Sequence, residues 1–365
     1  MSDWLPREEL QHLIDVLRGA GYHCVGPRVR DGAIVYEALE RAEDLPFQVR
    51  DVQSPGQYRL EPAPGPRRFA WANGPQAVKP LAFVPRDTLW RARRDADGNL
   101  GFEEAAPTVA PTAVIGVRAC DLAALAIQDR HFLEGHYADA HYAARRKALF
   151  LVAVHCTHPA ATCFCASTGD GPEARSGWDL ALAELDEGYR VSAGTAAGQH
   201  VLTHLDLEPA SEATARQAEE EIAAAARAQQ RSLPGRNLRD SLFANLDHPR
   251  WEEVAGRCLA CGNCTLVCPT CFCHREDEQP ALDGTRTEHT RSWDSCFAPG
   301  HAHLAGFNVR PDIRSRYRQW LTHKLGSWHD QFGRSGCVGC GRCISWCPTG
   351  IDITEEARAI CGDTP

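Results

Sequence analysis

Two runs of four cysteines constrain this chain more than any other feature of its sequence. The first is Cys258-x2-Cys261-x2-Cys264-x3-Cys268 followed by Pro269, and Cys337-x2-Cys340-x2-Cys343-x3-Cys347 followed by Pro348 repeats it. A loop with thiolates three residues apart can wrap three corners of a [4Fe–4S] cubane, while the fourth cysteine points away and completes the other cluster of a two-cluster protein. Zinc sites use pairs of cysteines instead. The spacing therefore predicts two [4Fe–4S] clusters.

This crossed arrangement assigns the ligands. We expect Cys258, Cys261, Cys264 and Cys347 to hold one cluster, and Cys337, Cys340, Cys343 and Cys268 to hold the other. The insert between the runs, residues 269–336, is much longer than the spacer of a small bacterial ferredoxin. It contains an expected helix, Ile313 to Lys324, with Tyr317, Trp320 and Leu321 on its inner face. Residues 249–365 are therefore expected to form a dicluster ferredoxin domain of the α-helical type.

Four further cysteines follow expected strands in the N-terminal part. Cys120 follows the apolar run 113–117, Cys156 follows the run 149–154, and a helix capped by Asp121 is expected between them. Such a βαβ unit brings both sulfurs to the same carboxyl edge of a parallel sheet. Cys163 and Cys165, two residues apart in extended backbone, would project to one face about 6.6 Å apart. These four could hold a third [4Fe–4S] cluster; buried structural thiols or a redox pair are the alternatives.

The remaining cysteines have less pattern. Cys271, Cys273 and Cys296 would need Asp294, His274 or another non-cysteine ligand to hold a further cubane. They could instead contribute to the third site across a domain interface, or simply pack. Cys24 and Cys361 have no partners in the pattern and are expected to be plain thiols.

The rest of the chain predicts an α/β domain over residues 1–208, a helical connector over 209–248 and the ferredoxin domain over 249–365. The connector should carry an exposed helix from Ser211 to Ser232, rich in Ala, Glu, Gln and Arg. A first helix is expected from a cap at Asp3 to Gly19, with Leu10, Leu13, Ile14 and Leu17 on one face, and a hairpin of 24–29 with 33–39 is expected to turn at Asp31-Gly32. The other expected elements are a helix over 178–185, a strand over 189–192 and a helix over 198–205.

Composition excludes several classes of protein. The chain has 365 residues and a net charge of -9, which argues against a nucleic-acid-binding surface. No apolar run approaches the roughly 18 residues of a membrane span, and the first ten residues lack an apolar signal core. We therefore expect a cytoplasmic protein, in which most of the 17 cysteines are metal ligands rather than disulfides.

Several motifs together resemble one family. They are RACDL at 118–122, HCT at 155–157, TCFCAS at 162–167, CLACGNCTLVCPTCFC at 258–273, WDSC at 293–296 and CVGCGRCISWCPTGIDI at 337–353. As a set they look like the motifs of the β subunit of cytoplasmic sulfhydrogenases, which are NAD(P)-linked [NiFe] hydrogenases. The A subunit of anaerobic sulfite reductase shares the pattern. The resemblance runs from about residue 75 to 358.

The resemblance implies an iron–sulfur subunit of a multi-subunit oxidoreductase. It would pass single electrons between a flavin subunit that reacts with NAD(P)H and the catalytic subunits of a hydrogenase or a sulfite reductase. Two other classes remain open, an enzyme that binds substrate at an open iron and a free electron carrier. The chain shows no P-loop, no flavin fingerprint and no Ser-His-Asp order, so we expect no catalytic centre of its own.

Overall fold

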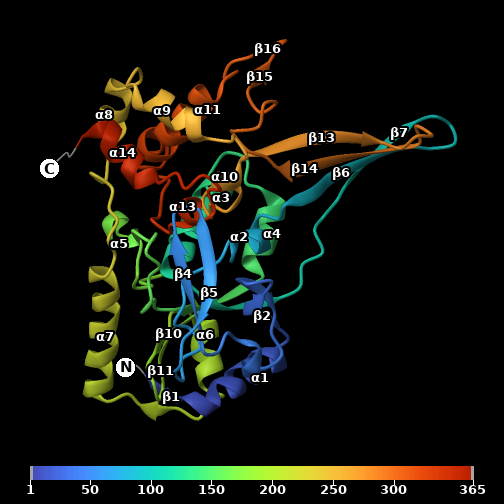
Figure 1. The fold of residues 1–365 in the computed structure, drawn as a ribbon. Helices are drawn as coiled ribbons and strands as arrows, with labels where there is room; N and C mark the ends of the chain where they lie inside the picture. The colour runs from blue at the N-terminus through green and yellow to red at the C-terminus, as the bar shows by residue number, and fades with distance from the viewer. Residues whose placement is uncertain (1–2, 363–365) are drawn as a thin grey trace.

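The computed structural model describes residues 3–362, and its N-terminal half is built around one mixed eight-stranded sheet (Figure 1). Four central neighbours, β2, β8, β9 and β10, run parallel, and the outer strands pair antiparallel. In sheet order the strands are β12 (Glu208–Pro209), β1 (Asp3–Pro6), β11 (Gly188–Ala193), β10 (Leu180–Glu184), β9 (Leu149–Val154), β8 (Thr112–Val117), β2 (His23–Arg30) and β3 (Ala33–Ala38). The expected α/β class is thus only loosely supported, since the region is rich in sheets of mixed direction.

The expected βαβ unit is present. β8 leads into α3 (Ala119–Leu133) and α4 (Ala140–Lys147), and the chain returns in β9 parallel to β8. Val114, Ile115 and Val152 are fully buried because helices cover the sheet faces. Asp121, expected to cap α3, lies inside that helix, and the N-cap position is occupied by Arg118.

Two further local predictions were wrong. Residues 178–185 were expected to be helical, but Leu180–Glu184 form β10, and every residue of this strand is buried. A short apolar run buried on both faces has no period that separates strand from helix. The N-terminal helix begins later than expected: Asp3–Pro6 form β1, and α1 spans Leu10–Gly19 with its predicted apolar face buried.

Other local predictions were confirmed. The hairpin β2–β3 turns at Asp31 and Gly32, both at positive φ. The strand β11 lies where it was expected. The helix α6 (Ala196–Leu202) begins two residues and ends three residues earlier than the expected range, and α7 (Glu212–Arg227), the connector helix, ends five residues before the expected Ser232. In Figure 1, α7 runs along one side of the molecule beside the N-terminal sheet, and the chain then continues to the C-terminal helices.

A second sheet joins the N-terminal half to the long insert. Its order is β13 (His274–Pro280), β14 (Arg286–Trp293), β6 (Arg86–Arg94) and β7 (Leu100–Glu104), all antiparallel. It projects from the body as an arm (Figure 1). Strands from residues 86–104 and 274–293 therefore share one sheet, and the proposed domain limits at 208 and 249 remain a prediction. Residues 1–2, at the start of the first proposed domain, and residues 363–365, at the end of the last, lie outside the described residues.

The C-terminal part has its own apolar core. Trp251, Tyr317, Trp320 and Leu321 are buried there with Phe297, and Tyr317, Trp320 and Leu321 form the predicted inner face of α11 (Ile313–Thr322). After α11 the chain makes a π-helical turn, His323–Ser327. Other helices of this part are α8 (Arg239–Ala244), α9 (Arg250–Arg257), α12 (Trp328–Phe332) and α14 (Ile353–Cys361). The insert also forms the short strands β15 (His303–Leu304) and β16 (Phe307–Asn308).

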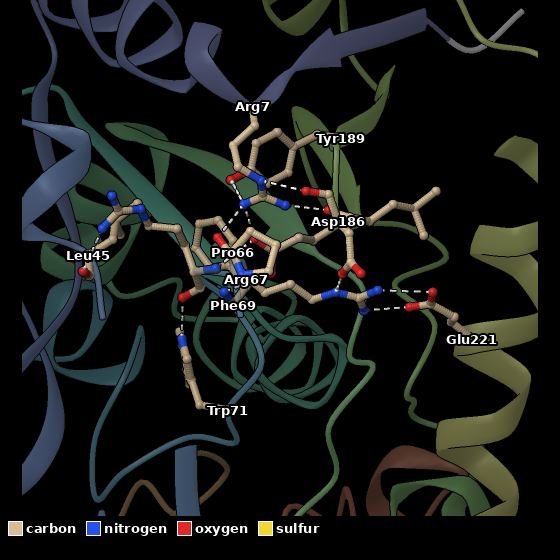
Figure 2. A network of polar contacts seen from close by, with 12 residues as sticks. Arg7, Leu45, Pro66, Arg67, Phe69, Trp71, Asp186, Tyr189 and Glu221 are labelled. Carbon is tan, nitrogen blue, oxygen red and sulfur yellow. Dashed lines mark hydrogen bonds and ion pairs between the residues drawn. The ribbon is translucent and has the colours of Figure 1, made fainter. Parts of the chain in front are cut away.

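A buried carboxylate and its neighbours connect loop 66–71 to the end of β10 in the main sheet, and Figure 2 shows the Arg7 and Arg67 side chains of this network. Glu184, at the end of β10, accepts hydrogen bonds from the backbone amides of Arg68 at 2.7 Å and Phe69 at 2.8 Å, and from the Arg7 guanidinium at 3.2 Å. Arg67 bonds Asp186 at 2.6 Å and reaches Glu221 of α7 at 3.0 Å. The network links the sheet, the loop and the connector helix. Within residues 3–362, no helix is long and apolar enough to cross a membrane.

Candidate iron–sulfur sites

The two cysteine runs form loops of the same backbone shape. In the first, Ala260 and Gly262 have φ of 50° and 78°; in the second, Gly339 and Gly341 have φ of 65° and 71° at the equivalent positions. Each loop then enters a short helix, α10 (Asn263–Leu266) or α13 (Arg342–Ser345). Glycine in the second loop is also needed for close packing, because a Cβ on Gly339 would lie 2.5 Å from the backbone of Cys165.

Backbone amides in both loops point at sulfur. The Ala260 amide donates to Cys258 Sγ at 3.4 Å, and the equivalent Gly339 amide donates to Cys337 Sγ at 3.4 Å. The Ile351 amide donates to Cys347 Sγ, also at 3.4 Å. Hydrogen bonds of this kind favour the thiolate and tune the potential of a bound cluster.

The first-loop set lines one cavity. Its walls include Phe297, Tyr317 and Trp320, and Cys261 is exposed at its edge. The first-loop set consists of Cys258, Cys261, Cys264 and Cys347. The fourth cysteine of the second run thus lies with the first three of the first run, as the crossed arrangement predicts.

The second-loop set lines a neighbouring cavity. This set consists of Cys268, Cys337, Cys340 and Cys343. Cys343 and Trp320 line both cavities, so the two sets are adjacent. None of the four second-loop cysteines is exposed, so this site is the more interior of the two.

Several of these thiols need a positive partner to ionise. Burial raises the pKa of Cys264 and of Cys343 well above the ordinary value, and the neighbouring thiols raise it further. Burial also raises the pKa of Cys337 to about 12. A bound metal supplies the missing charge, and its binding displaces the protons. The cavities, the converging thiols and the amide donors therefore fit a thiolate-bound cluster.

The third set, Cys120, Cys156, Cys163 and Cys165, also comes together. Cys120 lies in the first turn of α3, Cys156 follows β9, and Cys165 begins α5 (Cys165–Thr168). Burial, followed by the nearby thiols of Cys165 and Cys156, raises the pKa of Cys163. Cys163 Sγ lies 3.9 Å from the Cys340 carbonyl oxygen, so the third set packs directly against the second loop.

Cys271, Cys273 and Cys296 lie between the second loop and the base of the arm. Cys271 contacts Cys268, and Cys273 contacts Cys296 and the His301 ring, which together lower the pKa of Cys273. Asp294 bonds His301 Nδ1 at 2.7 Å. His274 Nδ1 bonds the Phe272 carbonyl oxygen at 3.1 Å. Among the described residues, no three or more His, Cys, Asp or Glu side chains are grouped so that they could share one single metal ion, and this applies to the three cysteine sets as well as to these residues.

The last two cysteines stand apart from these sets. Cys24 is buried in the core of the main sheet with 2% of its surface exposed. Cys361 is half-buried on α14 and packs against the C-terminal core.

Sequence reasoning missed three charged residues around the second loop. Arg342 is buried and pairs with Asp121 of α3 at 2.9 Å, which joins the second loop to the N-terminal half. Lys324 and Lys79 are buried beside Cys268. One signal could have found Lys324: it follows Tyr317 by seven residues, Trp320 by four and Leu321 by three, which are the helical spacings that continue their buried face.

Two comparisons with known proteins bear on these sites. Residues 257–351 match a family described as a 4Fe-4S dicluster domain. Over 292 residues, which are 77% of this chain and 82% of the relative, the sequence is 33% identical to a protein named sulfhydrogenase 2 subunit beta from Pyrococcus furiosus. No solved structure matches the chain.

The dicluster match supports [4Fe–4S] clusters in the C-terminal part, and with the relative it supports an iron–sulfur electron-transfer role. The family resemblance read from the cysteine motifs is thereby confirmed. The chain belongs to the family of sulfhydrogenase β subunits.

Proposed function

We propose that this chain relays single electrons between a flavin- and NAD(P)-binding subunit and the catalytic subunits of a [NiFe] hydrogenase complex. The observation that carries the proposal is the order of the cysteine sets. The third set touches the second loop, and the second-loop cavity adjoins the first-loop cavity through Cys343 and Trp320. Three adjacent cluster sites suit the transfer of electrons from one to the next better than they suit turnover of a substrate.

The proposed ligands follow the three sets. Cys258, Cys261, Cys264 and Cys347 hold one [4Fe–4S] cluster, and Cys268, Cys337, Cys340 and Cys343 hold a second. Cys120, Cys156, Cys163 and Cys165 hold a third. When bound, each cluster takes up and releases one electron, so a row of them divides the two-electron chemistry of a flavin into single steps.

The residues around the proposed clusters bond the ligand sulfurs and exclude water. The amides of Ala260, Gly339 and Ile351 bond the ligand sulfurs, and aromatic side chains such as Trp320 exclude water between the two cavities. The first-loop site reaches the surface through Cys261, which makes it the point of exchange with a partner subunit. The second-loop site lies between the other two and passes electrons inward.

Cluster content tests the cofactor part of the proposal. Iron, acid-labile sulfide and the EPR spectrum of the reduced protein are measured on anaerobically prepared full-length chain. About twelve irons per chain support three clusters, and about eight remove the third. A colourless sample, or one that contains zinc in place of iron, contradicts the proposal.

Co-purification tests the subunit part. Expressed with its neighbouring genes, the chain should elute from a sizing column with a flavoprotein and a hydrogenase subunit. A chain that elutes alone and without flavin contradicts a subunit role. The relative is named a sulfhydrogenase subunit, which favours hydrogen over sulfite as the terminal partner. Hydrogen uptake and sulfite reduction by the purified complex distinguish the two.

A further inference from the structure

Lysine is rare in this chain, and its placement is uneven. Of the 39 basic Lys and Arg residues, only Lys79, Lys147 and Lys324 are lysines. Lys147 is exposed in the last turn of α4. Lys79 and Lys324 are 5% and 4% exposed, and both touch Cys268 of the second-loop set.

Lys324 uses all three of its hydrogen-bond donors in this position. Its Nζ donates to Cys268 Sγ at 3.4 Å, to Thr270 Oγ1 at 3.0 Å and to the Gly336 carbonyl oxygen at 3.3 Å. The residue sits in the π-helical turn His323–Ser327, a local irregularity that is frequent at functional sites. The ammonium group is therefore held in place, facing a sulfur.

Lys79 approaches the same cysteine from the N-terminal half. It lies in α2 (Lys79–Ala82), and its Nζ donates to the Cys268 carbonyl oxygen at 3.3 Å. The Nζ also lies 3.9 Å from the ring centre of Trp293. Lys79 contacts a carbonyl dipole and an aromatic ring and not a sulfur, so its charge should act on the second-loop site less strongly than that of Lys324.

Neither ammonium group has a carboxylate partner within 4 Å among residues 3–362, whereas Arg342 nearby is paired with Asp121. A buried cation without an anion is strongly destabilising. The group that can supply negative charge to Lys324 is the Cys268 sulfur at 3.4 Å, and Lys79 faces the sulfurs of Cys271 and Cys268. By contrast, none of the described residues that line the first-loop cavity is charged.

We propose that Lys324, assisted by Lys79, raises the reduction potential of the cluster held by the second loop. The inference rests on the proposed function, because it requires that Cys268, Cys337, Cys340 and Cys343 hold a [4Fe–4S] cluster. Four thiolates already bring negative charge into this enclosed site, and burial makes one more electron harder to accept. A fixed positive charge against a ligand sulfur offsets this cost. The interior site thereby stays reducible from the exposed first-loop site.

The test is an EPR-monitored redox titration of the anaerobically prepared full-length chain. The variants are Lys324→Met, Lys324→Arg and Lys79→Met, and Lys147→Met is the matched control. The second-loop signal is identified as the one that disappears in Cys337→Ser but persists in Cys261→Ser. Iron is counted in every sample.

Removal of the charge should favour the oxidised cluster. In Lys324→Met we expect the ratio of reduced to oxidised second-loop cluster at a given potential to fall about tenfold, which is a shift of about 59 mV for one electron. Lys79→Met should shift in the same direction by less, Lys324→Arg should shift less than Lys324→Met, and the control should match the parent chain.

The outcomes show separately whether the lysine inference fails and whether the proposed function fails. A chain with full iron whose second-loop potential is the same in Lys324→Met and the control overturns this inference and leaves the proposed function intact. If Lys324→Met fails to retain iron, Lys79→Met decides: a lowered potential supports the inference and an unchanged one overturns it. If the parent chain itself contains no iron, both proposals fail.

Discussion

Burial alone does not distinguish a cluster ligand from a core thiol in this protein. Cys24 is buried in the main core, and burial raises its pKa to about 11, much as burial raises that of Cys337 to about 12. The difference lies in the neighbours: Cys337 faces Cys340, Cys268 and Lys324, whereas Cys24 faces Arg18 and Asp15. Only grouping with other thiols gives a site in which deprotonation is coupled to a metal.

The third set makes a prediction at this scale. Cys163→Ser removes one of its four sulfurs, so we expect iron to fall from about twelve to about eight per chain. The two loop clusters should remain, with their EPR signals intact. Cys361→Ser, which changes a half-buried cysteine outside the sets, is the matched control and should retain full iron. Equal iron in the two variants would contradict a third cluster.

A buried histidine predicts how stability depends on pH. His131 of α3 stacks on Phe272 with ring centres 3.5 Å apart, and burial lowers its pKa to about 4 from an ordinary 6.5. Between these values the unfolded chain binds a proton at this imidazole and the folded chain does not. The free energy of unfolding should therefore rise with pH from about 4 to 6.5 and level off above.

Urea unfolding of the parent chain and of His131→Phe at several pH values checks this. The variant keeps an aromatic ring against Phe272 but has no proton to bind, so its stability should rise less steeply with pH in that interval. Parallel curves for the two proteins would show that His131 does not contribute.

At the scale of elements, prediction succeeded where a residue pattern had a single meaning. The turn at Asp31 and Gly32 needs positive φ at both positions, and that pair predicted the hairpin β2–β3. Leu180–Glu184 is buried on both faces, so its apolar run fitted a helix and a strand equally, and the helix prediction was wrong. The pairing of β6 with β14 joins residues about two hundred positions apart, and no local pattern in either strand signals it.

The hydrogen bonds of Glu184 at the end of β10, here called the clamp, give a prediction for the free energy of unfolding. Glu184→Ala removes the acceptor of three donors, which are the backbone amides of Arg68 and Phe69 and the Arg7 guanidinium. We expect a loss of about 3 kcal/mol in the free energy of unfolding, which is the scale for breaking a buried charged pair. The matched control is Glu173→Ala, which removes an exposed ion pair with Arg175 and should cost about 0.5 kcal/mol or less. Equal losses in urea unfolding would contradict a structural role for the clamp.

At the scale of the whole molecule, the cysteine spacing predicted which thiols meet, because the fourth cysteine of each run lies in the cavity of the other run. The spacing could not predict what surrounds them. Lys79 reaches Cys268 from a segment 189 residues away, and Arg342 reaches Asp121 across 221 residues. Contacts of this range depend on how the two halves pack, and a single sequence carries no periodic signal for them.

The two cores predict different responses to removal of iron. The core of the main sheet is made of apolar side chains such as Leu13, Ile115 and Val152, and none of the three cysteine sets belongs to it. The C-terminal core includes Cys258, Cys264, Cys343 and Cys347 among its packed residues, so without iron its thiolates repel one another or its thiols surround a void. Chelation under anaerobic conditions should therefore loosen the C-terminal part first. Hydrogen exchange should speed up in residues 258–271 and 337–351, while β8, β9 and β10 keep their protection. Uniform loss of protection across both parts would mean that the sheet also depends on iron, and unchanged protection in both loops would mean that the loops hold their shape without it.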